Sequence, residues 1–265
     1  MRILLPVDGS EHCRNALRFI ASRQALSPEK EATVELLNVQ HSIPEAVINA
    51  LGLDSVRKAS QDEGMKVIDA MREDAGDLDV RAKVEGGEFA PVIVREADHM
   101  DADLIVMGCR GLSAMEGFFV GSVSAKVISL TKRPLLLVRD KIPAGAICVD
   151  HSDYAHAAAE FVVNQREFFG KDAVFEVINV SETEETFHQA VEPVMTVFED
   201  AGVPAERVHL KGKVGDAICN YAGEGKLDML VIGSHGYGNF RAAFMGSTAM
   251  RITAGCEVPL LVLKA

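Results

Sequence analysis

The sequence has no tryptophan, few other aromatic residues and no run of lysine or arginine. Its formal net charge of −12 argues against nucleic acid or an anionic membrane as a partner, because both are bound mainly through clustered basic side chains. No apolar run reaches the length that spans a bilayer. The segment that begins at Met1 is acidic and contains glycine, unlike a signal peptide, so we expect a cytoplasmic protein.

Cysteine is scarce and irregularly placed. The five cysteines never form a Cys-x-x-Cys pair; they are Cys13, Cys109, Cys148, Cys219 and Cys256. This pattern predicts a reducing compartment, with neither a disulfide framework nor a zinc site. The histidines fit no single helix face at metal-ligand spacing, so we predict no metal site. Cys109 lies inside a glycine loop, as a small apolar filler or as a redox-sensitive thiol.

That glycine loop is the most informative feature of the sequence. The apolar run Leu104–Met107 leads into Gly108, two residues separate Gly108 from Gly111, and nine separate Gly111 from Gly121-Ser122. A strand, a glycine-hinged loop and a helix start present free backbone N–H groups to a phosphate. The chain then repeats the pattern, with Leu230–Ile232 followed by Gly233, Gly236 and Gly246-Ser247.

The repeat extends over the chain and predicts two related α/β domains, residues 1–140 and 144–265. Short apolar strands alternate with helical patterns, which is typical of a parallel sheet covered on both faces. The expected strands are 2–7, 33–39, 80–84, 104–108 and 134–138, then 146–150, 174–180, 208–214, 228–233 and 259–263. The offset between the halves falls from 142 residues at Asp8 and Asp150 to 125 at Gly108 and Gly233. The second half is therefore 17 residues shorter, mostly between its second and third strands, where the first half has a long helix predicted over 54–74.

Asp8 ends the first strand of the first half, and the glycine loop follows the fourth. In an open α/β sheet these two points should face one another across the crevice where the strand order reverses. A carboxylate can accept hydrogen bonds from ribose hydroxyls, while the hydroxyls of Ser122 and Ser124 can supplement N–H donors to phosphate. The alternative is structural, because Asp8 can cap the following helix and glycine loops are often simple turns. The repeated nine-residue spacing favours the ligand-binding interpretation.

These residues resemble the universal stress protein family, in its ATP-binding branch. That branch is marked by glycine, two residues, glycine, nine residues and then Gly-Ser or Gly-Thr, and both halves fit it. The segments 6–10 and 133–139 are also similar to the family's first and last strands. The resemblance covers essentially the whole chain as a tandem pair. It implies two doubly wound, Rossmann-like α/β domains with five-stranded parallel sheets of order 3-2-1-4-5, packed as a pseudo-dimer through Leu135–Val138 and Leu260–Leu263.

The resemblance also implies a nucleotide site, in which Asp8 contacts the ribose, the backbone of Val39 meets the adenine and the glycine loop holds the phosphates. The implied set in the first half is Pro6, Val7, Asp8, Val39, Met107, Gly108, Arg110, Gly111, Gly121, Ser122, Val123 and Ser124. The matching set in the second half is Asp150, Val180, Ile232, Gly233, His235, Gly236, Gly246, Ser247 and Thr248. There, His151 replaces the glycine after the aspartate, His235 replaces Arg110, and Ala249 lacks the hydroxyl of Ser124. These departures make the first half the better ATP site.

The function that the resemblance implies is ATP binding, with Mg²⁺ or Mn²⁺ carried by the nucleotide, in a non-enzymatic regulator of the stress response. No carboxylate or histidine is clearly placed as a base toward a γ-phosphate, so no catalytic residue is assigned. A slow ATP hydrolase is one alternative, and a scaffold whose sites are empty or hold another small ligand is the other. The expected partner is an adenine nucleotide, and assembly is as an intramolecular pseudo-dimer or as a homodimer of tandem chains.

Overall fold

The computed structural model describes residues 1–26, 32–43, 49, 52–109, 121–139, 145–148, 153–169, 173–227, 229–233 and 247–263. The first half contains β1 (Arg2–Pro6), α1 (Glu11–Leu26), β2 (Thr33–Gln40), α3 (Leu53–Asp69), η1 (Arg72–Ala75), β3 (Asp79–Gly86), α4 (Phe89–His99), β4 (Leu104–Gly108), α5 (Ser122–Leu130) and β5 (Leu135–Val138). The second half contains β6 (Gly145–Cys148), α6 (Asp153–Asn164), α7 (Arg166–Phe169), β7 (Phe175–Val180), α8 (Glu184–Asp200), β8 (Ala205–Leu210), α9 (Val214–Tyr221), η2 (Ala222–Lys226), β9 (Met229–Gly233), α10 (Ser247–Gly255) and β10 (Leu260–Leu263).

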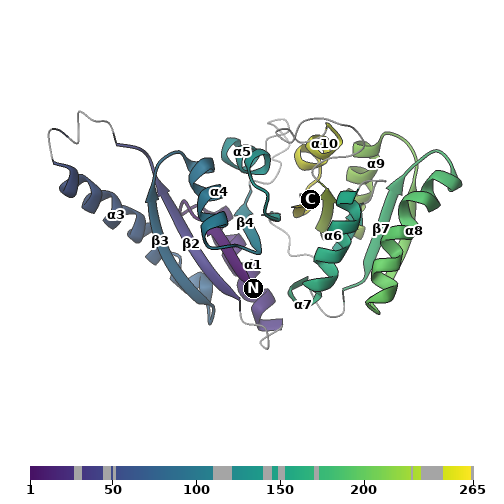
Figure 1. The fold of residues 1–265 in the computed structure, drawn as a ribbon, viewed down its shortest axis with the longest axis horizontal. Helices are drawn as coiled ribbons and strands as arrows, with labels where there is room; N and C mark the ends of the chain where they lie inside the picture. The colour runs from purple at the N-terminus through teal and green to yellow at the C-terminus, as the bar shows by residue number, and fades with distance from the viewer. Residues whose placement is uncertain are drawn as a thin grey trace.

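The strands form one continuous ten-stranded sheet, and the two halves lie side by side along it (Figure 1). The strand order is β3-β2-β1-β4-β5-β10-β9-β6-β7-β8, so the first half has the predicted order 3-2-1-4-5 and the second half repeats it in mirror sequence. Strands within each half pair in parallel. The halves join where β5 and β10 pair antiparallel, with Leu136 opposite Leu261. The predicted pairing of these two segments is therefore confirmed.

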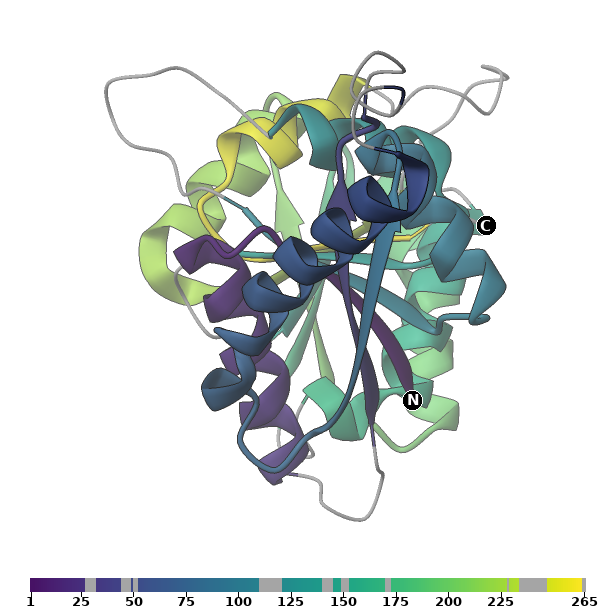
Figure 2. The same cartoon turned by 90° about the vertical axis from the view of Figure 1, so that its left-hand side faces the viewer.

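Helices cover both faces of the sheet, and strand side chains alternate between the two resulting cores. Along β4, Leu104 and Val106 belong to the core beneath α1 and α3, while Ile105 and Met107 belong to the core beneath α4 and α5. Each core continues into the second half, the first beneath α6, α7 and α8 and the other beneath α9 and α10. Figure 2 looks onto the end of the molecule at which α3 lies, with the sheet behind that helix.

Two predicted element ends are wrong, and the deletion in the second half spares the long helix. The strand expected over 208–214 is β8, which ends at Leu210 because Gly212 has a φ of 109°, outside the extended region; Val214 already begins α9. The helix expected over 54–74 ends at Asp69 and is followed by the 3-10 turn η1. The shorter connection of the second half retains its long helix, since α3 and α8 both have 17 residues. The loss falls instead on the segments that flank the helix.

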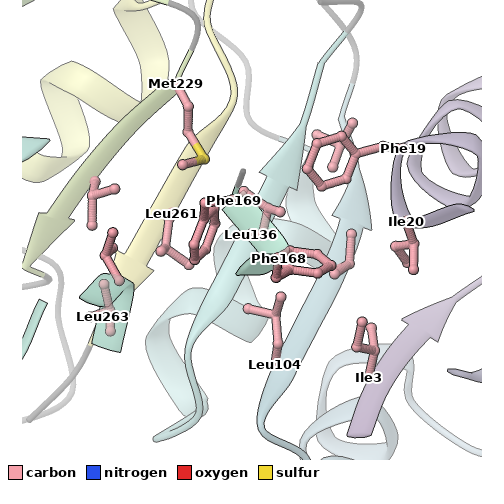
Figure 3. Close-up of a cluster of buried hydrophobic side chains, with 14 of the residues drawn as sticks. Ile3, Phe19, Ile20, Leu104, Leu136, Phe168, Phe169, Met229, Leu261 and Leu263 are labelled. Carbon is pink, nitrogen blue, oxygen red and sulfur yellow. The ribbon is translucent and has the colours of Figure 1, made fainter. Parts of the chain in front are cut away.

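The short helix α7, which the sequence analysis did not predict, adds a second connection between the halves (Figure 3). Its Phe168 lies edge-on to Phe19 of α1, with 5.9 Å between ring centroids. The buried Arg23 side chain of α1 donates to the carbonyl of Phe169 at 3.2 Å and lies 5.1 Å from the centre of the Phe19 ring. Both phenylalanines belong to the core that contains Leu136 and Leu261 on the joined strands. Packing and strand pairing therefore hold the halves together.

Candidate functional site

Asp8 lies just beyond β1, at the carboxyl edge of the sheet, and is exposed. Its Oδ1 accepts hydrogen bonds from the Ser10 N–H at 2.9 Å and the Cys13 thiol at 3.3 Å, which fix the carboxylate at the start of α1. Gly9 between them has a φ of 80°, a left-handed backbone that favours glycine. Asp8 therefore supports the first turn of α1 through Oδ1.

The ionisation of Asp8 follows from the same contacts. Partial burial raises the pKa of its carboxyl, but hydrogen bonds from Ser10 and Cys13 lower it, and the net pKa lies below the usual value. Asp8 is thus a carboxylate at neutral pH and a weak base. Such a group suits the acceptance of hydrogen bonds from hydroxyls better than the removal of a proton.

Gly108, at the end of β4, lies against the first turn of α1. A Cβ atom at this position would stand 2.1 Å from the carbonyl oxygen of His12 and 2.7 Å from the backbone nitrogen of Cys13, so no side chain fits. Because β4 is the parallel neighbour of β1, this contact places Gly108 beside the turn that carries Asp8. The structure thus brings the two predicted elements to one edge of the sheet. Beneath them, Met107 is buried in the core under α4 and α5.

The N-terminus of α5 completes this arrangement. Gly121 is the N-cap, with no side-chain cap, and the N–H groups of Ser122, Val123 and Ser124 donate to no acceptor among the described residues. Gly121 and Ser122 are exposed, whereas Ser124 is buried next to Cys109, the residue after β4. The start of α5 therefore lies beside the end of β4.

Cys109 is a buried free cysteine. Burial raises the pKa of its thiol, and the guanidinium of Arg139 and the hydroxyl of Ser124 lower it only in part. A thiol with a raised pKa is a poor nucleophile, so the structure favours the apolar-filler interpretation over the redox-sensitive one.

On the opposite side of Asp8, the ends of β1 and β2 are tied together by a residue whose role the sequence analysis missed. The buried Asn38 side chain donates to the carbonyl of Val7 at 2.8 Å and accepts from the amide of Gln40. The Val7 N–H in turn donates to the carbonyl of Leu37 at 2.9 Å. These bonds fix Val39, the residue predicted to meet the adenine, next to the segment Pro6–Asp8. The only sequence signal was the repeat Asn38-Val39 and Asn179-Val180.

The second half places its matching residues in equivalent elements. Val180 ends β7, Ile232 and Gly233 end β9, and Ser247 and Thr248 begin α10, both exposed. Ala249 is buried at the position of Ser124. Six predicted site residues lie outside the described residues: Arg110, Gly111, Asp150, His235, Gly236 and Gly246.

Arg139, which follows β5, reaches into the second half. Its guanidinium is 5% exposed and donates to the carbonyls of Thr253, at 2.5 Å, and Cys256, both at the C-terminal end of α10. Burial lowers the pKa of this guanidinium. A helix C-terminus carries partial negative charge, so the buried cation is held by a favourable field and by two acceptors. The end of α10 is thereby coupled to the half that holds Asp8 and Gly108.

The prediction that the chain has no disulfide is wrong, because Cys219 of α9 and Cys256 are bonded across 37 residues, with 4.8 Å between their Cα atoms. They are distant in sequence and meet through the packing of α9 on α10. Among the described residues, no group of three or more histidine, cysteine or acidic side chains could hold a metal ion. Within those same residues, no helix is both long and apolar enough to cross a membrane.

Comparison with known proteins identifies the family. The model of the universal stress protein family matches residues 1–139 and again residues 146–264. Universal stress protein YxiE of Bacillus subtilis is 31% identical over 151 residues, which cover 52% of this chain and 98% of that protein. A universal stress protein of Thermus aquaticus is 32% identical over 143 residues, covering 52% of this chain and 97% of its own length.

A solved structure shows the same fold over the whole tandem. The universal stress protein of Archaeoglobus fulgidus superimposes with a TM-score of 0.79 at 21% identity, over 99% of this chain and 98% of that one. The two matches to the family model account for both halves of the ten-stranded sheet. The chain therefore belongs to the universal stress protein family, as a member with two tandem domains.

Proposed function

We propose that the first half binds an adenine nucleotide, and that the protein is a nucleotide-dependent regulator of the stress response. The observation that carries the proposal is the convergence of Asp8, Gly108 and the N-terminus of α5 at one edge of the sheet. The Asp8 carboxylate suits a ribose hydroxyl, and the N–H groups of Ser122 and Val123, which donate to no acceptor among the described residues, suit phosphate. Val39 lies on the other side of Asp8, where an adenine base would extend.

ATP with Mg²⁺ or Mn²⁺ is the proposed ligand. The chain is acidic overall, with a formal net charge of −12, so a cation carried by the nucleotide would offset repulsion from its phosphates. The described side chains would hold the nucleotide through Asp8 and the α5 N-terminus rather than ligate the metal, because they contain no cluster of ligands. This arrangement binds and orients the ligand.

The described residues favour a binding protein over a hydrolase. Asp8 has a lowered pKa and is a weak base. In the second half, His209 lies between Ser181 and Glu184, with 3.1 Å from Nε2 to the Ser181 hydroxyl and 3.3 Å from Nδ1 to the Glu184 carboxylate. These three side chains resemble a nucleophile, a base and an acid, but Nε2 also lies 2.9 Å from the Ser181 carbonyl oxygen, which can only accept a hydrogen bond. Nε2 must carry a proton to donate to that oxygen, so it cannot take the proton of the Ser181 hydroxyl.

The test begins with protein purified without added nucleotide, which is denatured so that mass spectrometry can identify any released ligand. Calorimetric titration with ATP and Mg²⁺ then measures affinity. The informative variant is Gly121→Val, because a Cβ at Gly121 meets no atom of the described residues within 4 Å, whereas a side chain there would crowd a phosphate at α5. Gly223→Val is the matched control, since that glycine also has no neighbour within 4 Å and lies in the second half.

We expect Gly121→Val to lose at least about tenfold in ATP affinity, which corresponds to roughly 1.4 kcal/mol of binding free energy. Its Tm should fall only by the small amount that replacing an N-cap glycine by valine costs. Gly223→Val should bind as the wild type does. Absence of both copurified nucleotide and calorimetric heat would refute the proposal. Release of ADP that is lost in Gly121→Val and Asp8→Ala would instead establish the hydrolase, and release unchanged in both variants would indicate a contaminating enzyme.

A further inference from the structure

The second inference concerns the join between the halves and does not depend on nucleotide binding. We propose that Cys219 and Cys256 form a reversible thiol–disulfide pair, which dithiol reductants open and disulfide oxidants close, and which fixes the end of α10 where the two halves meet. Three observations carry it: the different accessibility of the two cysteines, the contacts around Cys256, and the residues at the equivalent positions of the first half.

The two cysteines differ in their surroundings. Cys219 is partly exposed on α9, whereas Cys256 is 2% exposed and lies between α10 and β10. An incoming thiolate would therefore attack the sulfur of Cys219. The disulfide bond breaks, the sulfur of Cys256 leaves as a thiolate and takes up a proton, and a mixed disulfide joins the reductant to Cys219. The second thiol of the reductant then displaces Cys219, so the protein gains two electrons and two protons while the dithiol becomes a disulfide.

The bond fastens one particular end of α10. Nearer its middle, α10 is already held to α9 by the ion pair of Arg251 and Asp216, 2.7 Å apart. Gly215 permits close approach there, because a Cβ would lie 2.5 Å from the Arg251 side chain. The disulfide instead acts at the C-terminal end, where the carbonyls of Thr253 and Cys256 accept hydrogen bonds from the buried guanidinium of the other half. Opening the disulfide should make the carbonyls that accept from Arg139 more mobile.

The first half shows that the fold does not need the cross-link. With the offset of 125 residues that relates Gly108 to Gly233, Cys219 corresponds to Val94 and Cys256 to Thr131. Val94 packs against the core and Thr131 is 2% exposed, so these positions lie in the same environment without a covalent bond. The double variant Cys219→Val, Cys256→Thr therefore copies a pair that this fold already accommodates.

The first measurement tests the chemistry. Native protein is equilibrated in mixtures of oxidised and reduced dithiothreitol, quenched with acid, denatured and alkylated with N-ethylmaleimide, and the modified cysteines are mapped by peptide mass. We expect one transition in which Cys219 and Cys256 become alkylated together, while Cys13 and Cys109 are alkylated in every mixture. Alkylation of all five cysteines in the oxidised protein would refute the bond. A bond that opens only in denatured protein would refute its reversibility.

The second measurement tests the consequence, by hydrogen exchange of the oxidised and reduced protein. We expect the amides in the last turn of α10 to exchange about tenfold faster or more after reduction, because local opening no longer has to stretch a covalent tether, while α5 is unchanged. The double variant should exchange at the same rate with and without reductant. Equal rates at α10 in both states of the wild type would overturn the proposed role at the join. A response of the double variant to reductant would also overturn it, by assigning the effect to other thiols.

Discussion

The contact between Gly108 and α1 makes a quantitative prediction about stability. In Gly108→Ala, the new Cβ would lie 2.1 Å from the carbonyl oxygen of His12 and 2.3 Å from its carbonyl carbon. Carbon atoms pack at about 3.5–4.0 Å, so the first turn of α1 has to move by about 1 Å or more. Both clashing atoms belong to backbone, and no rotamer change relieves them. The helix cannot yield freely either, because Leu17 and Ile20 on its buried face are fully enclosed.

We expect this substitution to lower the free energy of unfolding by about 3 kcal/mol, at the upper end of the range for overpacked sites. For a chain of this size that corresponds to a fall in Tm of roughly 6–12 °C. Gly86→Ala is the matched control, because a Cβ at that exposed glycine meets nothing within 4 Å and its φ is not in the left-handed region. The control should stay within about 0.5 kcal/mol of the wild type.

Thermal unfolding followed by circular dichroism, at one protein concentration and one redox condition, measures both variants. If Gly108→Ala melted within about 2 °C of Gly86→Ala, the close approach of β4 to α1 would be wrong. A side chain would then fit beside Asp8, and the first glycine of the loop would have no physical reason.

Three further predictions follow from contacts already described. Removing the guanidinium in Arg139→Ala should lower the free energy of unfolding by about 3 kcal/mol, because the buried carbonyls of Thr253 and Cys256 lose their donor. Urea unfolding would show this, and an unchanged midpoint would contradict the role of Arg139 at the join. In Phe168→Ala, loss of the contact with Phe19 should lower the free energy of unfolding by about 3 kcal/mol. The two halves should then unfold in two calorimetric transitions, whereas one unshifted transition would refute the role of Phe168 in joining them. Because folding lowers the pKa of Asp8, ionised Asp8 stabilises the fold above about pH 4, and this stabilisation is lost as the pH falls further. The difference in Tm between wild type and Asp8→Asn should therefore shrink below about pH 4, and a difference that stays constant with pH would contradict this prediction.

Local patterns were sufficient to predict the parallel strands and the duplication, because both depend on short apolar runs and on spacing that a duplicated chain displays twice. The strand pairing that joins the halves was predicted from the family resemblance instead. The end of β8 was missed because apolar residues continue past Gly212, and only its φ of 109° shows that the strand has ended. Asn38 was seen as a repeated residue, but its hydrogen bond from β2 to the end of β1 joins two strands and is not visible in the sequence.

What the sequence could not show are contacts between residues far apart in the chain. The disulfide of Cys219 and Cys256 closes over 37 residues and exists only because two helices pack. The bonds from Arg139 cross from one half to the other over more than a hundred residues. An arginine after a last strand, and cysteines without a motif, carry no pattern that reveals such partners. The meeting of Asp8, Gly108 and the start of α5 was more predictable, since these elements follow strand ends that the topology brings together.

The two ends of α10 explain why the halves can diverge without losing their common fold. Its N-terminus begins at the exposed Ser247, and the carbonyls at its C-terminal end accept hydrogen bonds from Arg139 of the other half. The helix dipole favours a cation at this second end, so the field and the hydrogen bonds hold Arg139 together. Cys256 lies at the second end, where a covalent bond to α9 restrains the helix far from its N-terminus. The first half has Val94 and Thr131 at the equivalent positions and no cross-link between them. The cross-link of the second half therefore acts directly on the join between the halves, and it affects the N-terminus of α10 only through the helix.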